Sequence, residues 1–273
     1  MSEENLRKIA KKIRLNVLKT AMKTGGKGAH LGGTFSCVEL LVAIYYGNII
    51  NFKSKNPEWG ERDRVLIGKG HAHLALYHIW SDLGLISKKT LNTYGENGST
   101  LGQQLNYKTP GSEYNTGSLG HVTGIGTGIC LAAKLDKKNY KTFAIVGDAE
   151  CDEGAIWESA MFAGKKLLNN LVVIVDKNNL SVMDTIEDGN ISTNLKDKFK
   201  ACDWNVREIN GHSFNEIISV LSPSNNYKKP TAIIANTIKG KGVSFMENEI
   251  FWHSGIPTRE QFNKAHKELN EKN

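Results

Sequence analysis

Two polar segments, each directly after an apolar run typical of a buried strand, contain residues that could bind a cation. They read Gly147-Asp148-Ala149-Glu150 and Asp176-Lys177-Asn178-Asn179. If the two strands are parallel neighbours, the carboxylate of Asp148 and the amide oxygen of Asn178 meet at one sheet edge, where they suit Mg²⁺ or Ca²⁺. A single negative charge binds such a cation weakly, so the pair predicts a ligand that brings its own anionic oxygens, such as a diphosphate. Alternatively, Asp148 caps the following helix and Asn178 forms a turn.

Glycines near residue 120 could bring backbone close to a phosphate. The segment Thr116-Gly117-Ser118-Leu119-Gly120 enters a predicted helix, and free amides at a helix start bind anions. Gly124, Gly126 and Gly128 follow inside the helix, where glycine costs stability, so close packing against a strand or a partner is expected. The chain has no GxGxxG after a strand and no GxxxxGK[ST], which argues against a dinucleotide-binding fingerprint and a P-loop.

The surrounding pattern alternates short apolar strands with helices. Strands are predicted at 64–67, 142–146, 171–175, 205–209 and 231–235, and helices at 5–24, 35–46, 72–83, 87–94, 119–135, 153–168, 194–200, 213–221 and from 258. This alternation predicts an α/β fold with a parallel sheet covered by helices on both faces. Ligands of such sheets bind beyond the carboxyl ends of the strands, after residues 67, 146, 175 and 235. The polar loop 95–117 is long enough to suggest a functional role.

Length and composition exclude several classes of protein. The chain has 273 residues and is 40% hydrophobic, which suffices for a core without disulfides. It contains neither an apolar run long enough to span a bilayer nor a hydrophobic stretch typical of a signal peptide. Its cysteines lack CxxC spacing, which argues against a zinc site and favours a cytoplasmic location. They are Cys37, Cys130, Cys151 and Cys202.

The net charge of +7 is concentrated in the first 27 residues, where eight Lys/Arg and two acids give 8 − 2 = +6. Apolar residues recur there at helical spacing, which predicts a surface helix with a solvated basic face. They are Leu6, Ala10, Ile13, Val17 and Ala21. A surface for nucleic acid or acidic lipid is the alternative. The segment contains no aromatic residue that could stack on bases, which weakens the nucleic-acid interpretation.

Several motifs together resemble the thiamine-diphosphate enzyme transketolase, in particular the N-terminal subunit of split transketolases. Gly147-Asp148-Ala149-Glu150 with Asn178-Asn179 is similar to the GDG…NN motif that binds thiamine diphosphate. The resemblance covers residues 5 to 265 and includes Ala29-His30-Leu-Gly32, Lys69-Gly-His71, Thr116-Gly-Ser-Leu-Gly120 and Lys239-Gly-Lys-Gly-Val-Ser-Phe-Met-Glu-Asn248.

The resemblance implies that residues 1–273 form a single thiamine-diphosphate (diphosphate and metal) binding domain. Asp148 and Asn178 would bind Mg²⁺, or alternatively Ca²⁺, through their side chains, and Leu180 through its carbonyl oxygen. The residues expected to bind the cofactor are Gly117, Leu119, Gly120, Gly147, Asp148, Ala149, Glu150, Asn178 and Leu180.

The resemblance also implies a set of catalytic residues. His30 and His71 match histidines that contact the sugar in the family, where imidazoles bond hydroxyls and transfer protons. Glu153 matches a glutamate at the family's subunit contact, although it could simply be an acid in the first turn of a helix. His121 stands where glutamine is common, and His253 lies one place before a family histidine whose own position holds Ser254. His73 and His78, on the following helix, are expected to be structural.

The sequence departs from the family pattern at several positions. The loop reads Leu101-Gly-Gln-Gln-Leu105 where the family has Gly-His-Pro, so a histidine that contacts the donor's hydroxyls is missing and the standard ketose-phosphate substrate is in doubt. Ala149 replaces the second glycine of GDG, and Met183-Asp184 replaces Asp-Gly. Neither change is expected to prevent cofactor binding.

The resemblance further implies that the chain is only half of an enzyme. The diphosphate-binding domain is expected to take up these 273 residues, which leaves no room for the pyrimidine-binding domain of the family. We therefore expect a separate C-terminal transketolase subunit, assembly into a heterotetramer with two of each subunit, and transfer of a two-carbon ketol unit between sugars or sugar phosphates. The alternatives are a related thiamine-diphosphate carboligase acting on an unusual or nucleotide-linked sugar, and a non-catalytic binding subunit.

Overall fold

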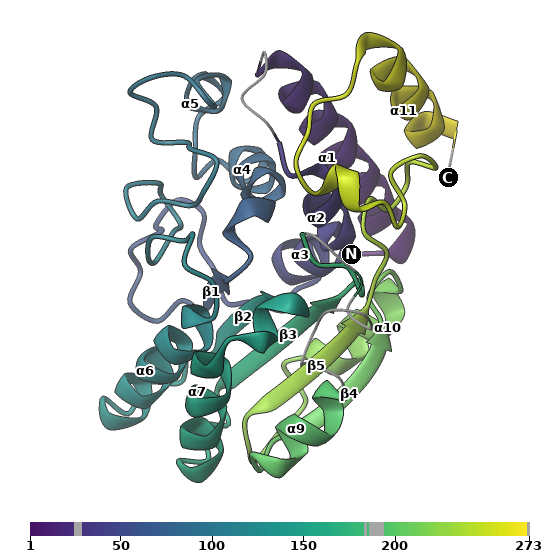
Figure 1. The fold of residues 1–273 in the computed structure, drawn as a ribbon. Coiled ribbons are helices and arrows are strands. Elements are labelled where there is room, and N and C mark those ends of the chain that lie inside the picture. The colour runs from purple at the N-terminus through teal and green to yellow at the C-terminus, as the bar shows by residue number, and fades with distance from the viewer. Residues whose placement is uncertain (25–28, 183–184, 186–193, 272–273) are drawn as a thin grey trace.

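A five-stranded parallel sheet forms the centre of the computed structural model, which describes residues 1–24, 29–182, 185 and 194–271 (Figure 1). The strand order is β1-β2-β3-β5-β4. Gly147 at the end of β2 lies opposite Asp176 near the end of β3, so the predicted adjacency of these strands is confirmed. The strands are β1 (Arg64–Ile67), β2 (Thr142–Gly147), β3 (Leu171–Lys177), β4 (Asn205–Asn210) and β5 (Thr231–Asn236).

Helices cover both faces of the sheet, as the alternating pattern predicts (Figure 1). One apolar core lies beneath α1 (Glu3–Lys23), α2 (Leu31–Ser36), α3 (Val38–Tyr46), α4 (His73–Asp82), α10 (Phe214–Leu221) and α11 (Arg259–Glu271). The other lies beneath α6 (His121–Leu135), α7 (Gly154–Lys165) and α9 (Leu195–Ala201). The short helix α5 (Lys88–Asn92) packs against α4, and it precedes the long loop that the sequence predicts.

The first helix has the amphipathic character expected from its sequence. All five residues of the predicted apolar stripe are buried, and the Ser2 side chain caps the helix start by accepting from the Asn5 amide (3.4 Å). Most basic side chains are solvated, whereas Arg14 is buried and ion-paired with Glu39 of α3 at 2.5 Å. The solvated basic face is therefore confirmed, with Arg14 as the exception.

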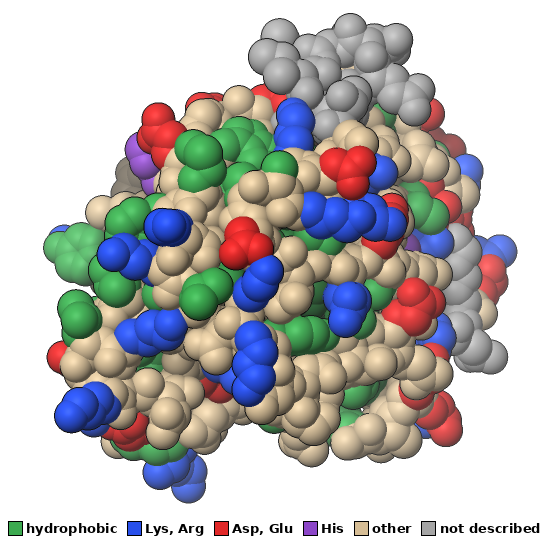
Figure 2. Space-filling model, turned by 90° about the horizontal axis from the view of Figure 1, so that it is seen from below, with side chains coloured by type: hydrophobic (Ala, Val, Ile, Leu, Met, Phe, Trp, Pro, Cys, Tyr) green, Lys and Arg blue, Asp and Glu red, His purple; other side chains and the backbone are tan. Residues whose placement is uncertain are grey.

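On the lower side of the molecule, Lys and Arg side chains are interspersed with Asp and Glu (Figure 2). No described helix is long and apolar enough to cross a bilayer. All four cysteines are free thiols.

The segment predicted as one helix over 35–46 consists of two helices. The first, α2, starts earlier, at Leu31, and Cys37 (φ −103°) separates it from α3. Gly32 and Gly33 argue against a helix in the sequence. They allow close packing instead, because a Cβ on Gly32 would approach the Trp252 carbonyl oxygen to 2.8 Å. The predicted helix 153–168 is shorter and follows a 3₁₀ turn, η2 (Ala149–Asp152).

The glycines of α6 differ in their surroundings. A Cβ on Gly126 would lie 3.2 Å from Leu171 of β3, and one on Gly124 would lie 3.0 Å from the Ser159 hydroxyl of α7. The expectation of close packing is confirmed at these two positions. Gly128 is exposed and has nothing within 4 Å of its Cβ position.

A buried ion pair joins the carboxyl ends of neighbouring strands. Lys69, just after β1, pairs with Asp176 near the end of β3, and both side chains are at most 3% exposed. The second Asp176 oxygen accepts from the Thr237 hydroxyl, just after β5. Ser36 at the end of α2 also donates to Asp176 (2.6 Å), so four segments meet at one carboxylate.

We expect Gly164→Ala and Gly128→Ala to change stability in opposite directions. A methyl on Gly164 would overlap the Cys202 carbonyl oxygen, so backbone must move, at a cost of roughly 1–3 kcal/mol. Gly128→Ala adds a methyl in open space and should stabilise the helix by about 0.5–1 kcal/mol. Urea denaturation of both variants tests this, and equal changes of one sign would contradict the packing described.

We expect Asp176→Asn to lower the free energy of unfolding by about 3–5 kcal/mol, because it leaves the Lys69 ammonium buried without a counter-charge. Asp203→Asn is the matched control, since the Asp203–Lys229 pair is solvent-exposed and such pairs contribute at most about 1 kcal/mol. Denaturant midpoints of the two variants measure the difference. Similar midpoints would show that the Lys69–Asp176 pair contributes little.

Candidate active site

A cleft lies beyond the carboxyl ends of the strands and collects most of the residues singled out in the sequence. Nine of them line it, namely His71, Leu119, Gly147, Asp148, Ala149, Glu150, Asn178, Leu180 and His253. The remaining lining residues are Gly33, Lys69, Ser181, Val182 and Lys239. The strand ends predicted to hold the ligand therefore do form one cleft.

Asp148 and Asn178 are brought together by the pairing of β2 with β3. The Asp148 carboxylate accepts from the amides of Ala149 (2.9 Å) and Asn179 (2.5 Å). It thus caps the 3₁₀ turn η2 and not α7. Asn178 forms a turn by accepting from the Leu180 amide (3.2 Å). Burial, together with the nearby charge of Asp176, raises the pKa of Asp148 to about 6.

Glu150 ties the glycine-rich helix entry to the end of β2. Its carboxylate accepts from the Gly120 amide (3.0 Å) and the Gly147 amide (3.1 Å). Burial raises the pKa of Glu150 to about 7. Gly120 starts α6 at φ +85°, a conformation that favours glycine. The amides of Gly120 and Gly147 thus hold Glu150 in place.

Three histidines from distant parts of the chain meet at the mouth of this cleft. The ring centroids of His71 and His253 are 4.9 Å apart, and His30 lies 5.3 Å and 5.4 Å from them. A backbone bridge between Ala29 and Gly255 brings His30 and His253 together. His253 lies one place before the position of the family histidine, which Ser254 occupies. It nevertheless belongs to the cluster.

The histidine cluster is uncharged at neutral pH. Burial lowers the pKa of His30, and burial with the nearby Lys69 charge lowers that of His71 far below its usual range. For His253, burial and the Lys239 charge lower the pKa to about 4. Neutral imidazoles both donate and accept hydrogen bonds. His30 Nδ1 is buried and has no partner within the described part of the chain, so its capacity for a hydrogen bond is unused there.

Lys69 and Lys239 line the cleft but were not assigned a site role from the sequence. Lys239 donates to the carbonyl oxygens of Ser181 (2.7 Å) and Leu180 (3.4 Å), and burial lowers its pKa to about 8. Both lysines follow strand ends, β1 and β5, where ligands of parallel sheets bind. Position after a strand was therefore the signal that could have found them.

Some predicted residues lie outside the cleft lining. Gly120 and His30 border it through Glu150 and the histidine cluster. Gly117 (φ +125°), His121 and Glu153 are not among its lining residues, and His121 and Glu153 are exposed. Glu153 packs against Gly120 and precedes α7 without capping it. Met183 and Asp184 lie outside the described residues.

His73 and His78 are structural, as expected. His73 bonds the Gly70 carbonyl oxygen (2.8 Å) and the Tyr94 hydroxyl (3.1 Å), and it is fully enclosed. His78 bonds the Thr20 hydroxyl of α1 at 2.9 Å. His78 therefore joins α4 to α1, His73 joins α4 to the turn at Tyr94, and neither imidazole lines the cleft.

The donor set of the cleft fits a divalent cation that is bound together with an anionic ligand. Asp148, Asn178 and the Leu180 carbonyl offer hard oxygen donors, which Mg²⁺ prefers. Among the described residues, no group of three or more His, Cys, Asp or Glu is arranged to hold a metal by itself. Such a partial set suits a cation whose remaining ligands come from a diphosphate and water.

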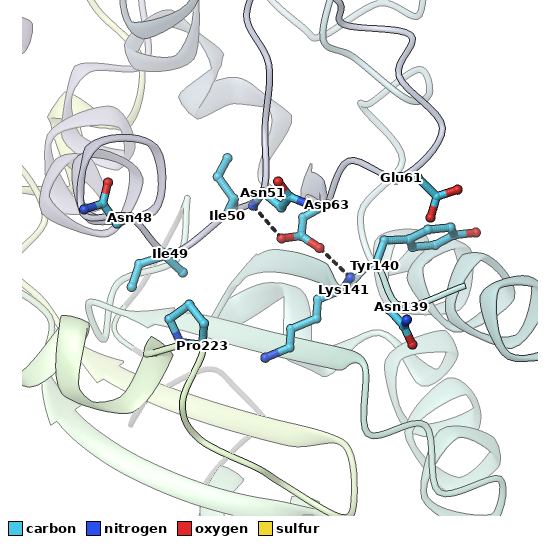
Figure 3. A pocket seen from close by; sticks show the side chains of 10 residues that line it. All are labelled: Asn48, Ile49, Ile50, Asn51, Glu61, Asp63, Asn139, Tyr140, Lys141 and Pro223. Atoms are coloured by element: carbon cyan, nitrogen blue, oxygen red, sulfur yellow. Dashed lines mark hydrogen bonds between the residues drawn. The ribbon is translucent and has the colours of Figure 1, made fainter. Parts of the chain in front are cut away.

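A larger pocket, of about 350 Å³, lies at the opposite edge of the sheet (Figure 3). It surrounds Asp63 and Lys141, which immediately precede β1 and β2. Figure 3 shows the Asp63 carboxylate accepting from the amides of Asn51 (2.7 Å) and Lys141 (2.6 Å). Both Asp63 oxygens are thus used to join two loops, and the pocket contains none of the histidines.

Comparison with known proteins identifies the family. Residues 6–270 match the family model described as transketolase, thiamine diphosphate binding domain. The chain is 39% identical to one of the apulose-4-phosphate transketolase subunits of Phocaeicola vulgatus, over 100% of this chain and 96% of that protein. It is 36% identical to a 6-deoxy-6-sulfo-D-fructose transketolase subunit of a Clostridium species, over 98% of each chain.

The fold agrees with this assignment. The structure superposes on transketolase from Campylobacter jejuni with a TM-score of 0.91 and 28% identity, covering 99% of this chain but only 43% of that one. Human transketolase is 29% identical over 91% of this chain and 39% of its own length. The chain belongs to the transketolase family and corresponds to its thiamine diphosphate binding domain.

Proposed function

We propose that this chain is the diphosphate-binding subunit of a two-subunit transketolase that transfers a two-carbon ketol unit between sugars. The observation that carries the proposal is the cleft in which Asp148 and Asn178, from adjacent strands, share one lining with His71 and His253. In this proposal residues 1–273 form a single cofactor-binding domain. Its free thiols support a place in the reducing cytoplasm.

In the bound state, Asp148, Asn178 and the Leu180 carbonyl hold Mg²⁺, or alternatively Ca²⁺, against the diphosphate. Gly117, Leu119, Gly120, Gly147, Ala149 and Glu150 form the cradle around it. Glu150 positions this cradle, since its two oxygens accept hydrogen bonds from the backbone amides of Gly120 and Gly147. Thiamine diphosphate supplies the electron sink that stabilises a carbanion.

The neutral histidines His30, His71 and His253 bind and orient the sugar. An uncharged imidazole accepts a hydrogen bond from a sugar hydroxyl at one nitrogen and donates at the other. His71 and His253 line the cleft directly, and His30 beside them has a ring nitrogen, Nδ1, without a described partner. Proton transfer at the substrate oxygens is their second task.

The second half of the active site comes from a separate pyrimidine-binding subunit. The relatives named as subunits have nearly this chain's length, and this chain covers only 39–43% of the full-length transketolases compared. Exposed apolar side chains near the cleft and on α7 support a docking surface, with Leu119 and Met161 36% and 56% exposed. Glu153 and His121 lie exposed on this side, and we place them at the contact, in a heterotetramer with two of each subunit.

The substrate is a sugar other than the common ketose phosphates. Gln103 and Gln104 stand where the family has His-Pro, and the Gln104 amide oxygen accepts from the Thr116 hydroxyl at 3.2 Å. The two relatives compared are named for apulose 4-phosphate and for 6-deoxy-6-sulfo-D-fructose. Replacing His-Pro by Gln103 and Gln104 would alter the contact to the donor's hydroxyls. The histidine cluster argues against a non-catalytic subunit, which would not need it.

We expect Asp148→Asn to weaken thiamine diphosphate binding in the presence of Mg²⁺ by about 100-fold, because it removes the only carboxylate of the proposed metal set. Calorimetry on the complex with the second subunit measures this affinity. Asp203→Asn, an exposed carboxylate far from the cleft lining, is the control and should bind normally. Unchanged affinity of the Asp148 variant, with an unchanged melting temperature, would refute metal-mediated binding.

We expect the purified chain alone, supplied with thiamine diphosphate and Mg²⁺, to show no ketol transfer. Activity should rise by several orders of magnitude when a pyrimidine-binding transketolase subunit encoded beside it is added, because that subunit completes the site. Transfer between sugars is followed by chromatography of the products. Turnover by the single polypeptide at the rate of the pair would contradict the two-subunit proposal.

A further inference from the structure

A third cavity lies between α1, α10 and α11. Its volume is about 220 Å³, which is room for a small polyatomic ion with water. Four of its lining residues are cationic, namely Arg7, Lys11, Arg14 and Lys241, and one is acidic, Glu39. Ala10, Phe214 and Leu269 form an apolar floor, which strengthens electrostatic attraction inside the cavity.

Arg14 is the central feature of this cavity. Its guanidinium donates to Glu39 at 2.5 Å and 2.7 Å and to the Phe35 carbonyl oxygen at 2.8 Å. One further donor, Nε–H, is buried and has no partner in the described part of the chain, while Arg14 as a whole is only 6% exposed. A buried donor without an acceptor destabilises the folded state, so an acceptor from a ligand would remove this cost.

Gly242 keeps the space beside this donor open. It adopts φ +102°, and a Cβ at that position would lie 3.8 Å from Arg14 Nε and 3.0 Å from Leu269. Any side chain there would narrow the approach to the guanidinium. Backbone strain and crowding therefore both favour glycine.

The charge of Glu39 is already neutralised by its partners. Besides Arg14, it accepts from His212 Nδ1 at 2.9 Å. His212 Nε2 accepts from the Ile238 amide (2.9 Å), so Nδ1 is the nitrogen that donates to Glu39. Each of the other three cations also has a described partner: Arg7 pairs with Glu3, Lys241 pairs with Glu247 at 3.5 Å, and Lys11 donates to the Asn270 carbonyl oxygen. Glu247 accepts from the Gly242 amide as well (2.9 Å). Glu3 and Glu247 do not line the cavity.

We infer that this cavity is a binding site for a phosphate group, either free phosphate or the terminal group of a small phosphomonoester. Arg14 Nε–H donates to one phosphate oxygen, and Arg7, Lys11 and Lys241 neutralise the dianion. The site is separate from the cofactor cleft, with which it shares no lining residue. It stands whether or not the proposed function holds.

Titration of the ¹⁵N-labelled chain with inorganic phosphate, at constant ionic strength kept with sodium chloride, tests the inference. We expect a saturable shift of the Arg14 Nε–H resonance, which is assigned by its loss in Arg14→Lys. Parallel titrations with glycerol 3-phosphate and with acetate distinguish the sources. Tighter binding of the ester assigns the site to a phosphomonoester, and tighter binding of inorganic phosphate assigns it to the free ion.

A double variant, Lys11→Gln with Lys241→Gln, should weaken phosphate binding about tenfold or more, because it removes two of the four cations. The matched control is Lys8→Gln with Lys19→Gln, which removes the same net charge from α1 residues that do not line the cavity. The control should bind within about twofold of the parent. A shift that does not saturate, equal binding of acetate, or equal weakening in both double variants would overturn the inference.

Discussion

The Lys69–Asp176 ion pair is the interaction on which the cleft depends. Asp176 is fully buried at the end of the central strand and bonds Ser36 and Thr237 as well as Lys69. It therefore connects the carboxyl ends of β1, β3 and β5 to α2. Buried pairs of this kind seldom add much net stability, but losing one partner is costly. The pair thus fixes geometry, and it holds the loops that carry His71 and Lys239 around one cavity.

Backbone pairing, together with the ion pair, brings the histidine-bearing segments of the cleft together. The histidines stand on three separate segments, the start of α2, the turn after β1 and the turn η3 (Ile250–His253). The bridge between Ala29 and Gly255 brings His30 and His253 together. The small residues Gly32 and Gly33 let α2 pack closely against its neighbours. Burial lowers the pKa of all three imidazoles, so neutral histidines lie beside the two lysines, Lys69 and Lys239, that line the same cleft.

Local patterns in the sequence were enough to predict the strands and the sheet end at which Asp148 and Asn178 meet, but not the cleft residues Lys69 and Lys239. The apolar runs before Asp148 and Asn178 predict strands, and the rule for parallel sheets then places both residues at one edge. Helix α2 was missed because its glycines argue against a helix, and only tertiary contacts with Trp252 explain them. Arg14 was placed on a solvated face because its partner, Glu39, is remote in sequence. The meeting of His253 with His30 depends on a bridge that no local pattern reveals.

The charge balance at the sheet edge explains why one aspartate suits a cation and its neighbour does not. Asp176 and Asp148 lie near the ends of adjacent strands, but Asp176 has the Lys69 ammonium against it. Among the described residues Asp148 has no ion-pair partner: its oxygens accept from backbone amides, and the Lys69 charge acts on it only from a distance. In a poorly hydrated cleft an unbalanced carboxylate attracts a positive ion strongly. The structural role of Lys69 therefore leaves Asp148 as the carboxylate with which a divalent cation can pair.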